Sequence, residues 1–307
     1  MANVLEYVTL FQQELDMQVT VGSTTGWMEK NAGQVIYNGG REVKVPKVTM
    51  DGLGDYDRSK GYTQGAVTLE YETMKMEMDR GRTFMLDSMD VNESNFVVNA
   101  SSVMGLFQKQ HVIPEIDAYR YSKIFSETAK VDERVKYSYE ATVTTILSEL
   151  KNQLASIQDL SGDIPLIISM SSIIASILEQ SSQLDDIEFG DGDIKRIVKS
   201  IDNVPIIKVP SKRMKTEYVF RDGKTSGQTE GGFTEGAKAL DINWLITPAS
   251  APIAVSKTDK PRIFTPDQNQ TADAYQIDYR KYHDLWILDE YLKLCRASVK
   301  QAKAVQE

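Results

Sequence analysis

The sequence predicts an α+β fold, and three patterns within its 307 residues lead to that prediction. Apolar and polar residues alternate on both sides of a glycine-rich stretch at residues 52–65, which is typical of a β-hairpin with one buried face. A long amphipathic helix is indicated next, and the middle of the chain then alternates helices with strands. A chain of this length can build one large or two modest cores.

The predicted hairpin occupies residues 34–78. Val43 and Val45 alternate with polar neighbours in its first strand. In its second strand the apolar residues move from odd to even positions, in the order Val67, Leu69, Tyr71, Met74, Met76 and Met78. This change of phase predicts a bulge or sharp twist near Glu72–Thr73. Because a two-stranded hairpin is marginally stable alone, its apolar face needs a partner.

The predicted long helix spans Asn92–His111. Asp90 and Glu93 have the spacing of a capping pair, and apolar residues at three- and four-residue steps form one stripe along it. Pro114 is expected to end this helix, because a proline disfavours helical geometry at the residue before it. A second helix is expected to start there, with acidic residues in its first turn.

The middle of the chain predicts a compact α/β domain over residues 136–241. Its expected elements, in order, are a helix with an apolar stripe from Val143 to Ile157, a strand at Ile164–Met170, a helix at Ile173–Gln180 and a strand at Val204–Val209. The stretch Phe220–Gly236 holds five glycines and few core residues, so an exposed, mobile loop is expected there.

Strands dominate the predicted C-terminal part. They are expected at Ile242–Thr247, Ile253–Val255, Arg262–Phe264 and Ala274–Asp278. The periodicity of Tyr282–Val299 fits either strands or a helix.

Several of these stretches carry motifs in a recognisable order. Asp79-Arg80-Gly81 is followed by Phe84-x-x-Asp87-x-x-Asp90, the long helix and Val-Ile-Pro-Glu-Ile-Asp-Ala-Tyr-Arg at residues 112–120. Further motifs are Ile263-Phe264-x-Pro266, Asn269-Gln270-x-Ala272-Asp273-Ala274-Tyr275 and Arg280-x-Tyr282-His283-Asp284-x-Trp286. Together they resemble the major capsid proteins of tailed double-stranded-DNA bacteriophages, which share the Hong Kong 97 fold.

The resemblance implies five segments. They are an N-terminal arm (1–33), an extended loop (34–78), a peripheral domain with the spine helix (79–135), an axial α/β domain (136–241) and strands that return to both domains (242–307). It implies a subunit that assembles with itself into the hexamers and pentamers of an icosahedral phage head around double-stranded DNA. A scaffolding protein, a portal and a decoration protein are implied as partners, with assembly in the host cytoplasm and a final place in the virion. No scaffolding domain is expected within the chain.

The resemblance also suggests contact residues. Five apolar side chains of the loop are expected to touch a neighbouring subunit: Val67, Leu69, Tyr71, Met74 and Met76. Arg80 and Arg82 are expected either to pair with acidic groups at the loop base or to be solvated. A lysine of this loop forms an isopeptide cross-link in some capsid proteins; here the loop lysines are expected to be exposed charges that protect an edge strand, at Lys44, Lys47, Lys60 and Lys75.

Composition argues against other functions. The formal net charge is −9 with no block of Lys and Arg, so tight DNA binding is not expected. No nucleotide-binding or hydrolase motif follows a strand, and His111 and His283 lack metal-ligand spacing, so no catalytic residue, cofactor or metal is expected. The acidic segment Gly190–Asp193 fits a solvated loop better than a calcium site.

The remaining features are consistent with a chain that folds in a reducing cytoplasm. Cys295 is the single cysteine, no signal peptide is indicated, and the most apolar run, Ile164–Leu178, is too short to cross a bilayer. Three alternatives stay open: the shell protein of an encapsulin-type nanocompartment, an enzyme with an unrecognised site, and another virion component such as a tail protein.

Overall fold

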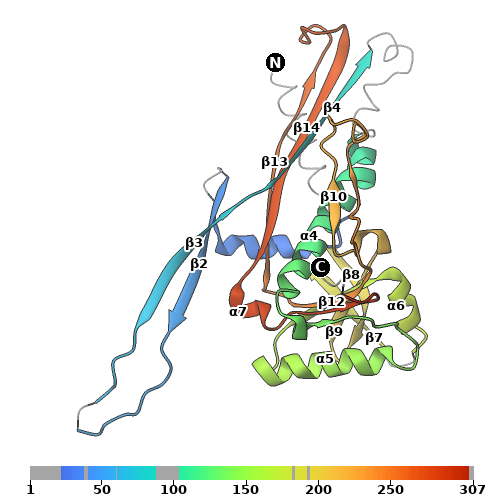
Figure 1. The fold of residues 1–307 in the computed structure, drawn as a ribbon. Coiled ribbons are helices and arrows are strands. Elements are labelled where there is room, and N and C mark those ends of the chain that lie inside the picture. The colour runs from blue at the N-terminus through green and yellow to red at the C-terminus, as the bar shows by residue number, and fades with distance from the viewer. Residues whose placement is uncertain are drawn as a thin grey trace.

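The computed structural model describes residues 22–37, 41–59, 61–87, 104–181, 184–191 and 194–303. Figure 1 shows three parts: a sheet flanked by helices, a tall three-stranded sheet above it, and a two-stranded ribbon that projects to one side. The mixture of helices and sheets confirms the predicted α+β class.

The lower part is built on a seven-stranded sheet in the order β5-β15-β12-β6-β9-β8-β7. Its strands are β5 (Val135–Lys136), β6 (Leu166–Ser171), β7 (Asp185–Asp191), β8 (Ile194–Ile201), β9 (Val204–Val209), β12 (Ile242–Pro248) and β15 (Arg296–Val299). The central pair β6 and β9 is parallel, and β12 is antiparallel to both of its neighbours.

Both faces of this sheet are covered. Along β12, Leu245 belongs to one core cluster and Trp244 and Ile246 belong to another, because successive side chains of a strand point to opposite faces. Ile242 shares the cluster of Leu245 because the register of the strand shifts between Ile242 and Trp244. The second cluster is closed by α5 (Ile146–Ser161) and α6 (Ser172–Leu178). Every residue of β6 is buried, as a central strand between two layers requires.

The predicted helix stripe in this part is confirmed where it meets the sheet. Leu150, Leu154 and Ile157 are buried, and the helix ends at Gly162, whose φ of 71° favours glycine. Val143 was predicted to belong to the stripe, but it precedes the helix and is exposed. The predicted strand at Val204–Val209 is confirmed at both ends.

The tall sheet has the order β13-β14-β4 and is antiparallel throughout. It consists of β4 (Met78–Asp87), β13 (Pro252–Phe264) and β14 (Ala274–Ile287). The ambiguous stretch Tyr282–Val299 therefore contains both kinds of element: the end of β14, the short helix α7 (Asp289–Leu292) and β15.

The prediction that Pro114 ends the long helix is wrong. Residues 104–107 are helical, a π-helical turn follows at Gln108–Val112, and α4 (Ile113–Thr128) continues from it. Ile113 keeps helical angles (φ −61°, ψ −48°), and its N–H donates to the Gln108 carbonyl. The ring of a proline collides with the carbonyl four residues earlier in a regular helix, and the wider π turn before Pro114 relieves that contact. The predicted start of this helix, from Asp90 to Val103, lies outside the described residues.

Helix α4 joins the two sheets. Its first half packs against β14 of the tall sheet, and residues of its second half, including Tyr121 and Ile124, enter the core on one face of the seven-stranded sheet. The segment before the ribbon also reaches that core through Met28, in the 3-10 helix η1 (Gly26–Gln34). The part of the predicted arm that the structure describes, residues 22–33, therefore packs on its own subunit.

The ribbon consists of β2 (Glu42–Met50) and β3 (Val67–Lys75), with the two-residue β1 (Ile36–Tyr37) beside its root. The strands pair without interruption from Glu42↔Lys75 to Met50↔Val67, so the predicted bulge near Glu72–Thr73 is absent from this ladder. A continuous antiparallel ribbon with an apolar phase change must carry apolar residues on both of its faces.

Candidate assembly interface

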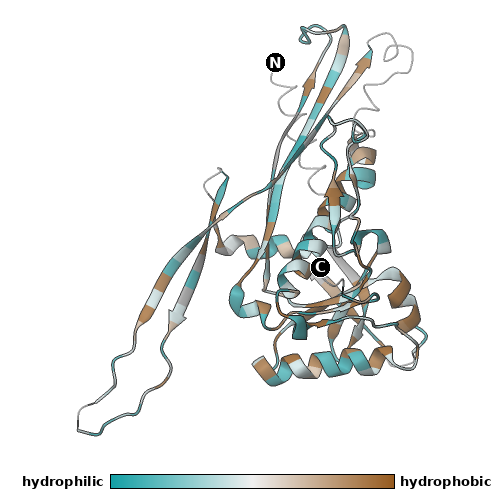
Figure 2. Cartoon of the chain, viewed as in Figure 1, coloured by the Kyte–Doolittle hydropathy of each residue, from teal (hydrophilic) through white to brown (hydrophobic). Residues whose placement is uncertain are grey.

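One face of the distal half of the ribbon is apolar and open to solvent. Val67, Leu69 and Tyr71 are 70%, 56% and 49% exposed, and Met50, which pairs with Val67, is 72% exposed. We call these four residues the stripe. Figure 2 shows brown bands at the distal end of β3, at a distance from the body of the subunit. Three of the predicted contact residues therefore lie side by side, and none belongs to a core cluster of the described residues.

The opposite face of the ribbon is apolar at its root and packs on the body. Val43, Val45 and Met76 are buried, and Met74 is partly buried against them. Their partners include Ile253, Val255 and Trp286, from the two long strands of the tall sheet. Met76 is 4% exposed within its own subunit and Met74 is partly buried, so most of the Met76 surface is already used there. Contact of Met74 or Met76 with a neighbour stays a prediction.

The register explains how the apolar set changes face without a bulge. Residues paired across an antiparallel ladder point to the same side, so Val43 shares a face with Met74, and Met50 with Val67. These two pairs lie on opposite sides because their positions differ in parity. The root of the ribbon thus packs on the body through one face. The distal half of the ribbon exposes apolar side chains on the opposite face.

Arg80 fastens the start of β4 to the rest of the subunit. Its guanidinium donates to both carboxylate oxygens of Glu115 on α4, at 2.6 and 3.3 Å, and to the carbonyls of Arg221 and Gly232, at 2.7 and 3.2 Å. This two-pronged pairing is the geometry that arginine and a carboxylate prefer. Of the alternatives for Arg80, the structure therefore shows the ion pair, and the acidic partner belongs to the same chain.

The glycine-rich segment Phe220–Gly236, predicted to be a mobile loop, is held in place. Its ends pair as β10 (Tyr218–Phe220) and β11 (Phe233–Glu235), and its backbone accepts the Arg80 bonds and a bond from Arg82 to the Thr229 carbonyl at 3.2 Å. Gly223 has a φ of 73°, and a Cβ there would lie 3.1 Å from the Arg82 guanidinium. Close approach of the backbone to arginine thus explains a glycine that the sequence suggested was only flexible.

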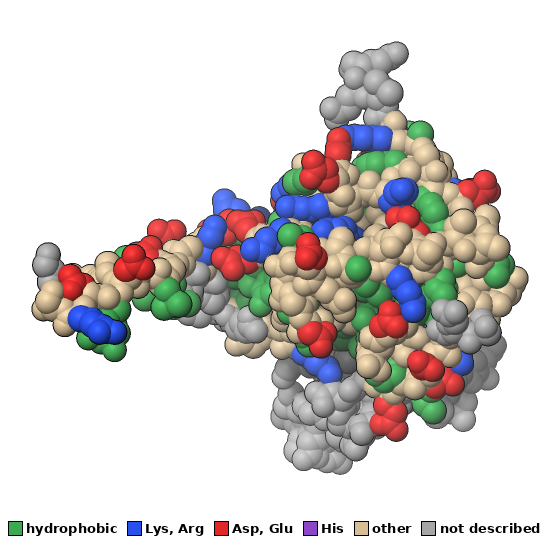
Figure 3. Space-filling model, turned by 90° about the horizontal axis from the view of Figure 1, so that it is seen from below, with side chains coloured by type: hydrophobic (Ala, Val, Ile, Leu, Met, Phe, Trp, Pro, Cys, Tyr) green, Lys and Arg blue, Asp and Glu red, His purple; other side chains and the backbone are tan. Residues whose placement is uncertain are grey.

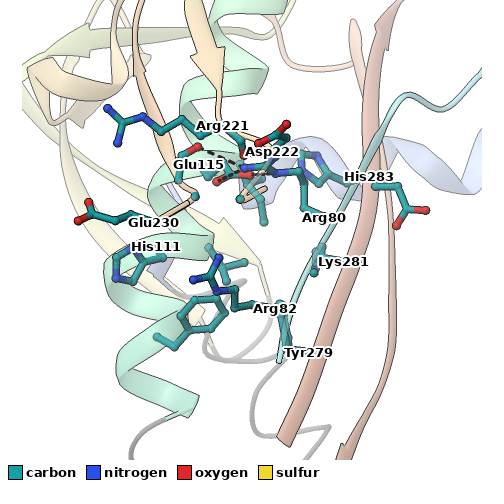
Figure 4. A pocket seen from close by; sticks show the side chains of 18 of the residues that line it. Arg80, Arg82, His111, Glu115, Arg221, Asp222, Glu230, Tyr279, Lys281 and His283 are labelled. Atoms are coloured by element: carbon teal, nitrogen blue, oxygen red, sulfur yellow. Dashed lines mark hydrogen bonds and ion pairs between the residues drawn. The ribbon is translucent and has the colours of Figure 1, made fainter. Parts of the chain in front are cut away.

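A cavity of about 400 Å³ lies between β4, α4 and this loop. Figure 4 shows Arg80 reaching Glu115 and Arg82 lying between β4 and the helix, and the lining also includes Lys281, Arg221 and Glu230. Because acidic and basic side chains alternate around the cavity, it has no strong preference for a ligand of one charge. Its polar groups serve mainly to seat the loop on the helix.

The two histidines lie in different environments. His111 is exposed on the π turn, whereas His283 is buried in β14 beside the ring of Tyr119. Burial, followed by the charges of Arg120, Lys281 and other cations, holds the pKa of His283 well below its usual range. His283 is therefore neutral at physiological pH. Within the described part of the chain, no group of three or more His, Cys, Asp or Glu side chains is placed to hold a metal ion.

Two buried carboxylates were not assigned roles from the sequence. Asp117 binds the hydroxyls of Ser23 and Thr25, at 2.6 Å each, and the guanidinium of Arg213 at 2.9 Å, so it anchors the segment that precedes the ribbon. Asp284 is enclosed where the ribbon joins the body. The sequence shows both residues inside motifs, but their partners lie 90 or more positions away, so spacing alone gives no role to either.

The loop lysines differ in their surroundings. Lys44 and Lys75 are exposed on the ribbon, and Lys47 forms an exposed ion pair with Asp289 at 3.3 Å. Lys60 lies outside the described residues. Among the described helices, none is both long enough and apolar enough to cross a bilayer.

No protein-family model matches the sequence, and no curated protein matches it either. Solved structures do match, over most of both chains. The mature capsid of bacteriophage PhiM1 aligns with a TM-score of 0.56 and 11% identity, covering 86% of this chain and 83% of that chain. The capsid of cyanophage P-SCSP1u aligns with a TM-score of 0.53 and 11% identity, covering 87% and 85%. A chain of Mycobacterium phage Che8 aligns with a TM-score of 0.51 and 10% identity, covering 86% of each.

Identities this low establish a common fold, and function has to be argued from the surface of this chain. The likeness covers more than four fifths of the chain. The expectation from the sequence motifs is confirmed at the level of the fold: this chain has the fold of phage capsid subunits, the Hong Kong 97-type fold.

Proposed function

We propose that the chain is the major structural subunit of a phage head, which assembles with copies of itself into a closed icosahedral shell. The observation that carries this proposal is the stripe of Met50, Val67, Leu69 and Tyr71 on a ribbon that projects from the subunit. An exposed apolar surface of this kind marks a protein interface. Its partner in this proposal is the body of a neighbouring copy.

The geometry of the ribbon supports this choice of partner. Figure 3 shows the ribbon extending away from the body, with hydrophobic side chains along it. Its root is packed through the opposite face, so the stripe cannot turn onto its own subunit without breaking the cluster of Val43, Val45 and Met76. The stripe is therefore available for a second subunit.

A closed shell follows from repeating this contact. A ribbon on one copy that docks on a different surface of the next makes a heterologous contact, which generates rings when the rotation closes. Hexameric and pentameric rings of one subunit then form the head. Each fully buried apolar side chain contributes about 1.5–3 kcal/mol, and every contact in the shell repeats that contribution.

The charge of the chain fits the interior of such a container. The net charge is −9, and a wall that repels phosphate weakly lets double-stranded DNA slide during packaging. The shell in this proposal encloses DNA without reading its sequence. A scaffolding protein, a portal and a decoration protein are its expected partners, and assembly takes place in the host cytoplasm before the subunit enters the virion.

The proposal is tested by charging the stripe. Val67→Asp with Leu69→Asp places two carboxylates on the docking face, and we expect electron microscopy and size exclusion to show folded single subunits in place of shells. Thr49→Asp with Thr68→Asp is the matched control, because this cross-strand pair lies on the other face of the same ribbon. Intact shells from the stripe variant would contradict the proposal.

The contents of the shells separate the proposed phage head from the alternative of a nanocompartment. Particles recovered from cells with their neighbouring genes are expected to hold double-stranded DNA, which nuclease treatment after disruption reveals. A packaged enzyme in place of DNA would favour the nanocompartment. Tubes in place of closed particles would favour a tail component.

A further inference from the structure

The ribbon leaves the body through a short connection. β3 ends at Lys75 and β4 begins at Met78, so Met76 and Glu77 form the exit between the ribbon and the tall sheet. Both polar groups of the peptide bond that joins them are held by side chains of β14. The Met76 carbonyl accepts from the Tyr282 hydroxyl at 2.8 Å, and the Glu77 N–H donates to the Asp284 carboxylate at 2.9 Å.

Asp284 is itself fixed from several sides. Its side chain has no exposed surface, and its other oxygen accepts from the Tyr119 hydroxyl at 2.7 Å and from the Lys123 ammonium at 2.5 Å. Burial, together with the charge of Asp284, raises the pKa of Tyr119, so its hydroxyl stays protonated and donates. Tyr119 and Lys123 both belong to α4. The carboxylate therefore ties the exit peptide to the helix as well as to the sheet.

Aromatic rings complete this arrangement. The Lys123 ammonium lies 5.3 Å from the centre of the Tyr119 ring and 5.9 Å from that of Trp286, within the range of cation–π attraction. Trp286 and Tyr282 also pack in the apolar cluster under the ribbon root. The same few side chains thus hold the exit by hydrogen bonds, by charge and by packing.

We propose that Tyr282 and Asp284, supported by Tyr119 and Lys123, form a clamp that sets the angle at which the ribbon leaves the subunit, and that this angle determines the curvature of the assembled shell. The second half of the proposal rests on the proposed function. The first half concerns the single chain and does not.

A small change at the clamp has a large effect at the stripe. The nine residues of β3 extend about 30 Å at about 3.3 Å per residue. A rotation of about 10° at the exit therefore moves the distal end by roughly 5 Å, which is about the spacing of two neighbouring strands. A displacement of that size changes where the stripe meets the next subunit, and with it the angle between subunits.

Two substitutions weaken the clamp to different degrees. Tyr282→Phe removes only the hydroxyl that binds the Met76 carbonyl and leaves the ring in its cluster. Asp284→Asn keeps the shape but replaces one acceptor oxygen by an NH2 group, and every group bonded to that carboxylate is a donor, so at least one donor loses its partner. Tyr275→Phe, nearer the other end of β14, is the matched control.

The first measurement is hydrogen exchange of peptides that cover residues 72–80 in the unassembled chain. We expect Tyr282→Phe to raise exchange at the exit about fivefold, the factor that one net hydrogen bond is worth, and Asp284→Asn to raise it further. The control is expected to exchange at the wild-type rate. If Asp284→Asn does not fold, Tyr282→Phe decides. If residues 72–80 of the folded Tyr282→Phe chain exchange at the wild-type rate, the proposed clamp is contradicted.

The second measurement is the distribution of shell diameters by electron microscopy. Tyr282→Phe is expected to give shells of broader or shifted diameter, while Tyr275→Phe gives the wild-type distribution. Faster exchange together with unchanged diameters would overturn the link to curvature. If the wild-type chain forms no shells under any assembly condition, the proposed function fails, and the exchange result still decides whether the clamp exists.

Discussion

The ribbon and the seven-stranded sheet use apolar residues in opposite ways. In the sheet, Trp244 and Ile246 are covered on one face and Leu245 on the other, so the side chains contribute to the stability of the single chain. In the ribbon, Leu69 and Tyr71 are exposed although they alternate in the same manner. Periodicity therefore indicates that a face will be buried, but it does not say whether the same chain buries it.

The difference has a geometric origin. The inner strands of the sheet have neighbours on both edges and are covered on both faces, whereas the ribbon has two long strands and packs on the body through the apolar cluster at its root. A two-stranded element gains little stability alone, and an exposed apolar face on it favours association. The body can be regarded as the part that folds and the ribbon as the part that assembles, and the following substitutions test that division.

Breaking an ion pair is expected to give the largest difference in stability loss between the body and the ribbon. Asp117→Ala removes a fully buried carboxylate and leaves the Arg213 guanidinium without its partner, so we expect a loss of about 3–5 kcal/mol in the free energy of unfolding. Lys47→Ala breaks the exposed pair with Asp289 at the ribbon and is expected to cost less than about 1 kcal/mol. Urea unfolding of the unassembled chain measures both values, and equal losses would contradict the division.

Leucine truncation compares the two regions with the same chemical change. Leu150→Ala in the body is expected to destabilise the unassembled chain by about 2–5 kcal/mol, because it leaves a cavity in a closed core. Leu69→Ala in the stripe is expected to stay within about 0.5 kcal/mol of the wild type in the same unfolding experiment, yet to weaken assembly. A large loss of stability from Leu69→Ala would show that the stripe is used within the subunit.

The pH dependence of stability is expected to originate in the body. His283 is neutral in the folded chain, whereas the unfolded chain takes up a proton below its ordinary pKa of about 6.5. The unfolded state then binds more protons than the folded state, so stability falls as the pH is lowered through 6.5, by at most about 1.4 kcal/mol per pH unit.

This slope is measured by urea unfolding of the unassembled chain between pH 7 and pH 5. His283→Leu is expected to flatten the slope, whereas substitution of the exposed His111 by Gln is expected to keep it. If stability depends on pH in His283→Leu as steeply as in the wild type, the pH dependence originates in other groups.

The elements that the sequence predicted well are those fixed by short-range patterns. The strand at Val204–Val209 and the stripe of Leu150, Leu154 and Ile157 depend on spacing alone, and both were found. Pro114 was misjudged because its effect depends on the geometry of the preceding turn, where a π turn makes room for the ring.

Only part of the candidate interface could be predicted, because some of its residues have partners far away in the sequence. Val67, Leu69 and Tyr71 could be selected by alternation, but the same alternation selected Met76, whose burial depends on Trp286, more than 200 positions away. For Arg80 the sequence left open an acidic partner or solvation, because Glu115 and the carbonyls of the glycine-rich loop come together only in the folded chain. Long-range partners of this kind leave no periodic signal in the sequence.

The central claim is that a second subunit covers the stripe, and thiol labelling of Leu69→Cys tests it most directly. The native Cys295 gives little background, because burial raises its pKa to about 12 and removes it from solvent. We predict rapid labelling at position 69 in the unassembled chain and strong protection in assembled shells. Equal labelling rates in the two states would show that the stripe stays exposed after assembly and would contradict the account.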